Sequence, residues 1–163
     1  MGTNPVVGFL RTLWLFLSGR VVFFRKDAGK IIQMEDGHRF RIFRHVKIRS
    51  ANKERPGGVF IVRFRPVNMG IEENIRFSRL AMMIFMGFRG FREKYWCVDD
   101  ETGLCQGVYA WQTVEDAENY SKSIAMRVMT RRSDPESVTG RVIDQSKAPY
   151  WLFSKELTQK VAV

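Results

Sequence analysis

Alternating and helically spaced apolar residues divide the chain into a regular series of elements. Residues 4–18 are apolar on almost every side and begin with Asn4 and Pro5, which predicts a short capped helix. From Ile31 the period changes to two, which predicts a hairpin with a turn at residues 35–37. In its second strand we expect one side to be apolar, with Phe40, Ile42, Val46 and Ile48, and the other basic, with Arg39, Arg41, His45, Lys47 and Arg49.

Residues 50–58 are polar and contain a proline and a glycine pair, so they form the best boundary in the chain. Beyond it the pattern predicts a β-α-β-β-α-β order, with strands at 59–67 and 137–143 and a hairpin between two helices. The first helix is expected at 68–89. The second is expected from Thr113 to Arg132, with Ala117, Tyr120, Ile124 and Val128 on one face.

The predicted fold class is therefore α+β, with a ferredoxin-like domain at 55–145. Residues 1–54 form an N-terminal extension, an apolar helix and a basic hairpin, and residues 146–163 form an aromatic C-terminal tail. The tail is expected to pack on its own domain or on a partner's. Helices cover one face of such a sheet, and its other face is apolar here, so we expect a homodimer that closes a barrel.

The net charge of +10 lies entirely in the first 66 residues, which hold 14 Lys and Arg against 4 Asp and Glu. Such a segment favours an anionic partner. Nucleic acid is disfavoured, because Phe43 is the only aromatic residue on the basic side of its strand. The N-terminal helix is too short to span a bilayer. We expect it to lie on the dimer body, with anionic lipid as the alternative.

The two cysteines, Cys97 and Cys105, lie on opposite arms of the hairpin. A turn centred on Glu101 would place them face to face, whereas a neighbouring register allowed by Gly103 would not. We expect free thiols in a reducing, cytoplasmic compartment. The sequence carries no zinc spacing, phosphate loop, nucleophile elbow or carboxylate pair, so hydrolase, kinase and metalloenzyme functions have no support.

The order of elements from Gly58 to Ile143, with V-Y-A-W-Q-T followed by E-D-A-E-N-Y, resembles the dimeric α+β-barrel superfamily of antibiotic-biosynthesis-type mono-oxygenases. The resemblance implies a pocket between sheet and helices for a small, flat, often aromatic molecule. Some members oxidise it without metal or flavin, others bind haem, and others cyclise or isomerise it. Haem-binding relatives place a histidine on or near the second helix. This chain has none there, so no cofactor or metal is expected.

The candidate ligand-binding residues are Arg63, Met82, Tyr95, Tyr109, Trp111 and Tyr120. Tyr109, Trp111 and Tyr120 match the family's pocket positions. Buried Tyr and Trp need partners for their polar atoms, and a pocket of them can orient a polar aromatic ligand; a purely structural core is the alternative. Arg63 would pair with an anionic oxygen if its side faces the pocket, and is otherwise a charge at the edge of the sheet. No catalytic residue is assigned.

Two functions remain open at this point. The first is a cofactor-independent mono-oxygenase or cyclase-like protein acting on a small aromatic or polyketide-like compound. The second is a non-catalytic ligand-binding or membrane-peripheral module, which docks on anionic lipid through its N-terminal helix and basic strand. The expected partners are accordingly a small hydrophobic or aromatic ligand, a second copy of the chain and, in the alternative, a membrane surface.

Overall fold

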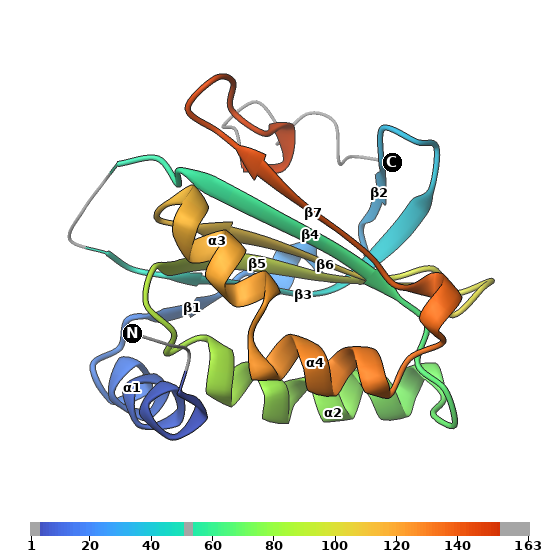
Figure 1. Cartoon of the computed structure of the whole chain (residues 1–163), viewed down its shortest axis with the longest axis horizontal. Coiled ribbons are helices and arrows are strands. Elements are labelled where there is room, and N and C mark those ends of the chain that lie inside the picture. Colours follow the sequence, from blue (N-terminus) through green and yellow to red (C-terminus); the bar gives the residue numbers. More distant parts are fainter. Residues whose placement is uncertain (1–3, 51–53, 154–163) are drawn as a thin grey trace.

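The computed structural model describes residues 4–50 and 54–153, which form a seven-stranded antiparallel sheet with helices on one face (Figure 1). The strands are β1 (Val21–Phe23), β2 (Ile31–Gln33), β3 (Arg39–Ile48), β4 (Gly58–Phe64), β5 (Phe91–Val98), β6 (Cys105–Trp111) and β7 (Thr139–Asp144). The helices are α1 (Pro5–Leu17), α2 (Ile71–Phe85), α3 (Val114–Ser121) and α4 (Ile124–Arg131), with 3₁₀ turns η1 (Arg25–Asp27), η2 (Pro135–Ser137) and η3 (Trp151–Phe153).

The strand order is β1-β3-β5-β6-β4-β7, and β2 also pairs with β3. From β4 to β7 the chain follows the β-α-β-β-α-β order, so the predicted ferredoxin-like fold is confirmed. The N-terminal strand β3 pairs with β5 and thereby extends the same sheet. Of the predicted domain boundary, residues 51–53 lie outside the described residues.

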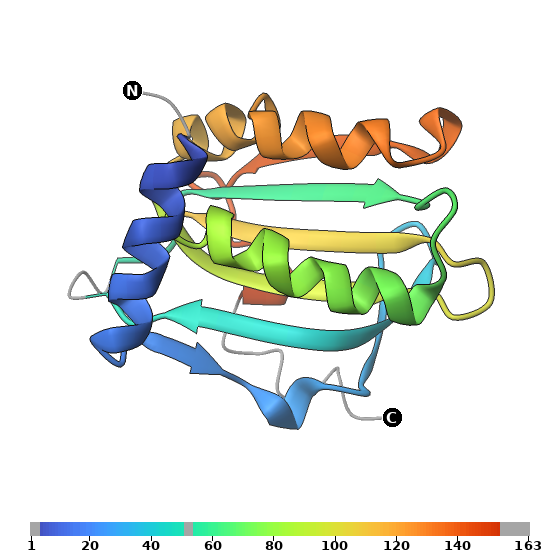
Figure 2. The ribbon, with the colours of Figure 1, turned by 90° about the horizontal axis from the view of Figure 1, so that it is seen from below.

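Helices α2, α3 and α4 lie on one face of the sheet (Figure 2), and their side chains pack with those of the strands in one core. Its members include Phe60, Val62, Phe85, Met86, Trp96, Tyr109, Trp111 and Tyr120. Thr113 caps α3 as predicted, because its side chain accepts a hydrogen bond from the backbone N–H of Asp116. This core forms the floor and walls of the cavity described below.

The opposite face of the sheet is covered by the chain itself. Tyr150 and Leu152 pack on Val59, Ile61 and Val108, all of which are at most 7% exposed. The tail therefore packs on its own domain, one of the two expected arrangements; its residues 154–163 lie outside the described residues. The argument that a bare sheet face requires a dimer no longer holds, and dimerisation stays a prediction.

The predicted sides of β3 were wrong in one respect. A bulge between Ile42 and Arg44 adds a residue to this strand opposite β5. As a result Phe40 and Ile42 lie in the core beneath the tail, whereas Val46 and Ile48 lie in the core beneath the helices. The bulge reverses the alternation halfway along the strand, because side chains in a strand alternate with a period of two.

The second predicted helix is two helices. Ser123 accepts a hydrogen bond from the backbone N–H of Met126 and caps α4, so the chain turns between α3 and α4. Tyr120 stays buried on α3, but Ile124 and Val128 are exposed on α4 and Met126 is buried in their place. A single helical face through all these positions is therefore wrong.

The hairpin adopts the register that keeps the cysteines apart. Gly103 has φ of 70°, a left-handed conformation that favours glycine, and Cys97 pairs with Gln106 while Cys105 pairs with Val98. The two thiols therefore point to opposite faces of the sheet. Both are free and buried, as expected.

The helix α1 begins at Pro5 with Asn4 as its N-cap, as predicted, and the Asn4 side chain accepts hydrogen bonds from the backbone N–H groups of Val6 and Val7. It crosses the C-terminal end of α2, where its backbone at Gly8 lies against Gly87 so closely that no Cβ would fit. Among the described residues, no helix is both long and apolar enough to cross a membrane.

Candidate functional site

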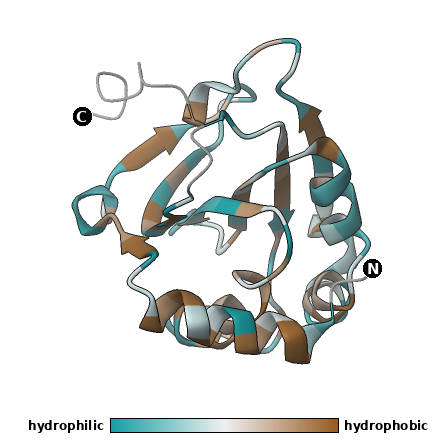
Figure 3. Cartoon of the chain, turned by 90° about the vertical axis from the view of Figure 1, so that its left-hand side faces the viewer, coloured by the Kyte–Doolittle hydropathy of each residue, from teal (hydrophilic) through white to brown (hydrophobic). Residues whose placement is uncertain are grey.

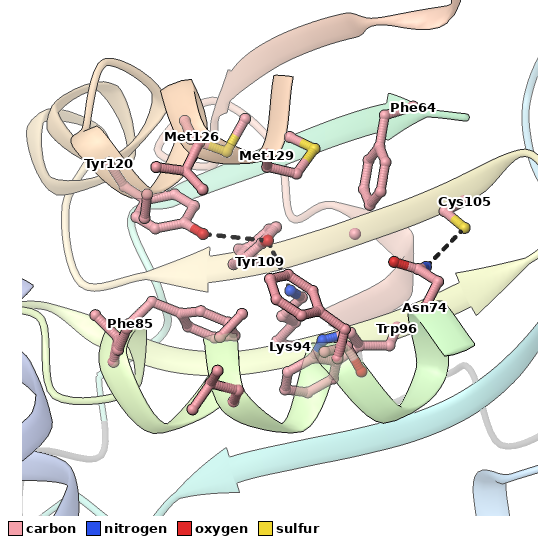
Figure 4. A pocket seen from close by; sticks show the side chains of 18 of the residues that line it. Phe64, Asn74, Phe85, Lys94, Trp96, Cys105, Tyr109, Tyr120, Met126 and Met129 are labelled. Carbon is pink, nitrogen blue, oxygen red and sulfur yellow. Dashed lines mark hydrogen bonds between the residues drawn. The ribbon is translucent and has the colours of Figure 1, made fainter. Parts of the chain in front are cut away.

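A cavity of about 230 Å³ lies between the sheet and the two helices α2 and α4 (Figure 4). Strands β4, β5 and β6 provide its floor. Its lining is almost entirely apolar and includes Phe64, Phe77, Phe85, Trp96, Met126 and Met129. The polar side chains that line it are few, and one of them is a buried lysine.

Lys94 is the central polar residue of the cavity. It stands on β5 directly opposite Tyr109 of β6, and its Nζ donates a hydrogen bond of 2.6 Å to the Tyr109 hydroxyl oxygen. The same nitrogen lies 4.0, 4.2 and 4.3 Å from the ring centroids of Tyr109, Trp96 and Phe85. Aromatic faces partly replace the water that an ammonium would lose here.

Burial lowers the pKa of Lys94 well below the usual lysine value, and the nearby Arg44 guanidinium lowers it further. Arg44 is itself partly buried, which lowers its own pKa to about 10, and the nearby Arg79 adds to that effect. Among the described residues Lys94 forms no ion pair with a carboxylate. The cavity therefore holds a neutral amine, or an ammonium that needs an anion from a ligand.

Two tyrosines extend the polar group. The Tyr120 hydroxyl donates to the Tyr109 hydroxyl oxygen at 3.3 Å, and burial raises the pKa of both phenols above the usual value. Both phenols are therefore neutral donors. Gly107 lines the cavity beside them, and a Cβ there would lie 2.7 Å from the Tyr109 ring, so this glycine makes room for the ring.

A thiol lies at the other end of the cavity. Cys105 Sγ accepts a hydrogen bond of 3.2 Å from the amide of Asn74. Burial raises the pKa of Cys105 to about 12, although the Asn74 hydrogen bond opposes this shift. A thiol with so high a pKa is a poor nucleophile, so the amine is the more reactive group in this cavity.

The structure brings together two of the six predicted ligand-binding residues. Tyr109 and Tyr120 line the cavity, and Trp111 packs behind them, with its ring 4.8 Å from that of Tyr120. Met82 is packed into the helix-side core. Arg63 and Tyr95 lie on the opposite face of the sheet. Ligand binding by any of the six stays a prediction.

Arg63 and Tyr95 have other surroundings. Arg63 lies over the Phe40 ring, with its centroid 5.2 Å from the guanidinium, and its Nη2 donates to Asp36 at 3.2 Å. Tyr95 stacks on His45 at 3.8 Å between ring centroids and contacts Phe153 of the tail. Arg63 therefore does not face the helix-side cavity, and the condition for its pairing with a substrate oxygen there is not met.

Sequence reasoning missed Lys94. The signal was present in F-R-E-K-Y-W-C-V, where Lys94 has the same parity as Trp96 in a strand flanked by apolar partners. A charged residue at an inward-facing position of a central strand is a functional candidate. The run of three charged residues at 92–94 hides it, since such a run suggests a solvated strand end.

His45 was expected to be solvated, and this expectation was wrong. It is 5% exposed, with Nδ1 at 2.7 Å from Asp27 and Nε2 at 2.7 Å from Glu93. The bulge in β3 turns it toward the tail side of the sheet, where it stacks on Tyr95. This cluster lies across the sheet from the cavity and has no access to it.

Comparisons with known proteins show the fold. At 10% sequence identity and a TM-score of 0.51, the chain is similar to a ferredoxin-fold protein of Listeria monocytogenes related to antibiotic-biosynthesis mono-oxygenases; 68% of this chain matches 66% of that one. A haem-degrading enzyme of the same species is similar at 12% sequence identity and a TM-score of 0.52; the match covers 71% of this chain and 82% of that one. A mono-oxygenase-like protein of Listeria innocua is similar at 12% sequence identity and a TM-score of 0.51; the match covers 83% of this chain and 86% of that one.

These similarities show that the chain has a ferredoxin-like fold, as the resemblance implied. No family model matches the sequence, and no curated protein matches it. At such low identity the likeness concerns the fold alone. The function must therefore be argued from the cavity.

Haem does not fit the residues of this cavity. Neither described histidine lines it, since His45 is held across the sheet and His38 lies in the turn before β3. Burial raises the pKa of the Cys105 thiol and of the Tyr109 and Tyr120 phenols, so the anionic forms that could bind iron are disfavoured.

Proposed function

We propose that the protein is a cofactor-independent mono-oxygenase whose substrate is a small aromatic or polyketide-like compound with an acidic phenol, enol or activated methylene. The observation that supports this most is the Lys94 amine, buried in an apolar cavity without a carboxylate partner among the described residues. A neutral amine at this position can act as a general base. A substrate that delivers one converts two neutral groups into an ion pair in a dry site.

The tyrosines complete this chemistry. Once Lys94 has taken the proton, the substrate oxygen carries negative charge, and the neutral Tyr109 phenol can donate to it while Tyr120 donates to Tyr109. The aromatic walls hold a flat ring, and the thioethers of Met126 and Met129 adapt to its edge. The cavity selects an apolar body with one acidic group.

The proposed reaction needs molecular oxygen as the only oxidant. The carbanion form of an activated CH₂ group transfers an electron to O₂, and the two radicals combine to form a C–O bond. Loss of the second C–H proton with cleavage of the O–O bond leaves a carbonyl and releases water. One CH₂ group and one O₂ molecule thus give one carbonyl group and one water molecule. Lys94 returns its proton to the departing oxygen.

A phenol that changes colour on ionisation tests the proton transfer directly. We expect 4-nitrophenol to bind as its phenolate at a pH where it is neutral in solution, and Lys94→Met to abolish this absorbance. Lys47→Met is the matched control, because Lys47 is exposed on β3, pairs with Glu93 and does not line the cavity. Phenolate formation that survives Lys94→Met would contradict the role of Lys94.

Oxygen uptake tests the reaction itself. With anthrone-type ketones that carry an activated methylene, we expect uptake of O₂ and formation of the corresponding carbonyl. Lys94→Met should lower kcat by about 10²–10⁴-fold, the usual contribution of a general base. Tyr109→Phe should lower it less, and Tyr95→Phe on the opposite face should not change it. Phenolate binding without oxygen uptake would instead support a non-catalytic ligand-binding protein.

A further inference from the structure

The outward side of α1 is an apolar surface without a covering element among the described residues. Its exposed apolar side chains are Val6, Val7, Phe9, Leu10, Leu13, Trp14 and Leu17. Leu10 is 60% and Leu17 88% exposed, so the helix uses only a narrow stripe around Gly8 and Thr12 to pack on the protein. Figure 3 shows hydrophobic residues along this helix at the lower edge of the molecule.

The cavity opens onto the same layer. Its mouth is rimmed by Leu80 of α2 and by Ile124 and Val128 of α4, which are 62%, 50% and 47% exposed. Pro5 at the start of α1 also lines the cavity, so the apolar surface continues from α1 to the mouth. The three helices lie side by side in one layer, with α1 across one end of α2 (Figure 2). An apolar rim of this kind favours contact with an apolar phase over water.

The charges of this surface are positive. The charged residues of α1 and α4 are Arg11, Arg127 and Arg131, all exposed, and neither helix has an acidic residue. Arg20, just beyond α1, lies over the Trp14 ring at 4.8 Å. The acidic residues of the helical layer lie at its margins. Glu72 and Glu73 are in the first turn of α2, whereas α1 crosses the other end of that helix. Glu115 and Asp116 of α3, which lies nearer the sheet (Figure 1), line a pocket with Val7 and Arg11 on the flank of α1 that faces α3.

We propose that the layer formed by α1 and the rim of the cavity docks on an anionic lipid bilayer, with the cavity mouth facing the lipid. With 13 residues, α1 can lie in the interface but cannot span the membrane. A second copy fits less well, because a two-fold contact through this face would bring its arginines together. The phosphates of an anionic membrane complement both the arginines and the apolar side chains.

The docking surface differs from the one that the sequence suggested. The basic strand was expected to share the lipid contact, but Arg41 pairs with Asp100, Lys47 pairs with Glu93, and His45 is buried. Among the helices of this layer, α1 and α4 carry only basic charged residues, and with Leu80 of α2 they form the proposed docking face. Docking does not depend on the proposed reaction, and the test below therefore uses no substrate.

Co-sedimentation with vesicles tests the proposal. We expect the full chain to bind vesicles of mixed phosphatidylcholine and phosphatidylglycerol, to bind phosphatidylcholine alone more weakly, and to lose affinity as salt rises. Leu10→Glu and Leu17→Glu should each weaken binding by about tenfold or more, the loss of one buried leucine. Gln33→Glu adds the same charge on the exposed side of β2, away from the helices, and should have little effect.

A fourth variant tests the position of the cavity mouth. Leu80 lies on α2, not on α1. If the cavity mouth faces the bilayer, Leu80→Glu should also weaken vesicle binding by about tenfold. All three leucines are exposed, so the melting temperatures of these variants should match that of the parent, and folding failure cannot imitate the result.

Three results would overturn the inference. One is a parent protein that does not bind phosphatidylglycerol vesicles at low salt. Another is binding that Leu10→Glu and Leu80→Glu leave unchanged. The third is a parent that forms a dimer without binding vesicles and that Leu10→Glu converts to a monomer in sedimentation, since the face would then contact a second copy.

Discussion

Lys94 shows how one residue can set the chemistry of a fold and its stability at the same time. Its amine has exchanged water for three aromatic rings and one hydroxyl, which replace the water only in part, so burial disfavours the charged form. A residue held in this way destabilises the folded state unless a ligand supplies an anion. Functional sites commonly carry such a cost.

The pH dependence of stability should reveal this cost. Between the lowered pKa of folded Lys94 and the usual lysine pKa of about 10.4, unfolding takes up a proton, so stability rises with pH in that window. We expect Lys94→Met to raise the free energy of unfolding at neutral pH. The gain should shrink by up to about 1.4 kcal/mol for each pH unit as pH rises within the window.

Denaturant titrations of both proteins across this range measure the effect. Lys47→Met, exposed on β3, should differ from the parent by about 0.5 kcal/mol or less. A constant difference between Lys94→Met and its parent at every pH would show that the amine titrates alike in both states.

Asp27 should change the stability of the protein with pH by a different mechanism, since it is an acid whose pKa is lowered by folding. Burial opposes its ionisation, but hydrogen bonds from Lys30 and His45 outweigh burial and lower the pKa of the carboxyl. Its stabilising effect is therefore present above the unfolded pKa of about 3.9 and is lost as pH falls through the lower folded pKa.

Asp27→Asn should lower the free energy of unfolding by about 1–3 kcal/mol at neutral pH and by less below pH 3. Asp100→Asn, at an exposed pair with Arg41, should cost about 1 kcal/mol or less. Urea denaturation at both pH values measures these losses of stability. Equal losses at the two sites would mean that the buried His45 cluster stabilises the protein no more than an exposed ion pair does.

At the scale of elements, the sequence predicts what periodicity and caps control. The strands of the β-α-β-β-α-β order, the Asn4 and Thr113 caps and the free thiols all follow from local pattern. The bulge in β3 and the break at Ser123 do not, because one inserted residue or one cap changes the face of every side chain beyond it. The two central tyrosines were predicted because they match the pocket positions of the family that the chain resembles. Lys94 was not, because it stands in a run of three charged residues.

The docking of α1 on α2 depends on two glycines. A Cβ on Gly87 would overlap the backbone of Gly8, and neither backbone can move without separating the helices. We expect Gly87→Ala to cost about 1–3 kcal/mol, the usual effect of overpacking, and to increase proteolysis within α1. Gly70→Ala precedes α2 in open space and should change stability by less than about 1 kcal/mol. Equal melting temperatures for the two variants would show that α1 is not held at this contact.

At the scale of the whole molecule, the C-terminal turn η3 decides what the second face of the sheet can do. Leu152 is 2% exposed and packs with Cys97, Val59 and Ile61, so one chain buries the face that a barrel dimer would otherwise share. The apolar face therefore has a cover within the monomer. Its removal should turn the same face into an association surface.

Leu152→Asp tests this arrangement. A buried carboxylate cannot be solvated beneath the tail, so η3 should leave the sheet, lower the melting temperature and expose Cys97. Mass-spectrometric mapping of thiol labelling should find Cys97 modified, while Cys105 on the helix side stays protected. Sedimentation should show self-association that grows with concentration. The control Leu17→Asp, at an exposed position of α1, should leave both thiols protected. If Cys97 stays protected in Leu152→Asp, something other than the tail covers this face, and a dimer through the sheet again becomes the best explanation.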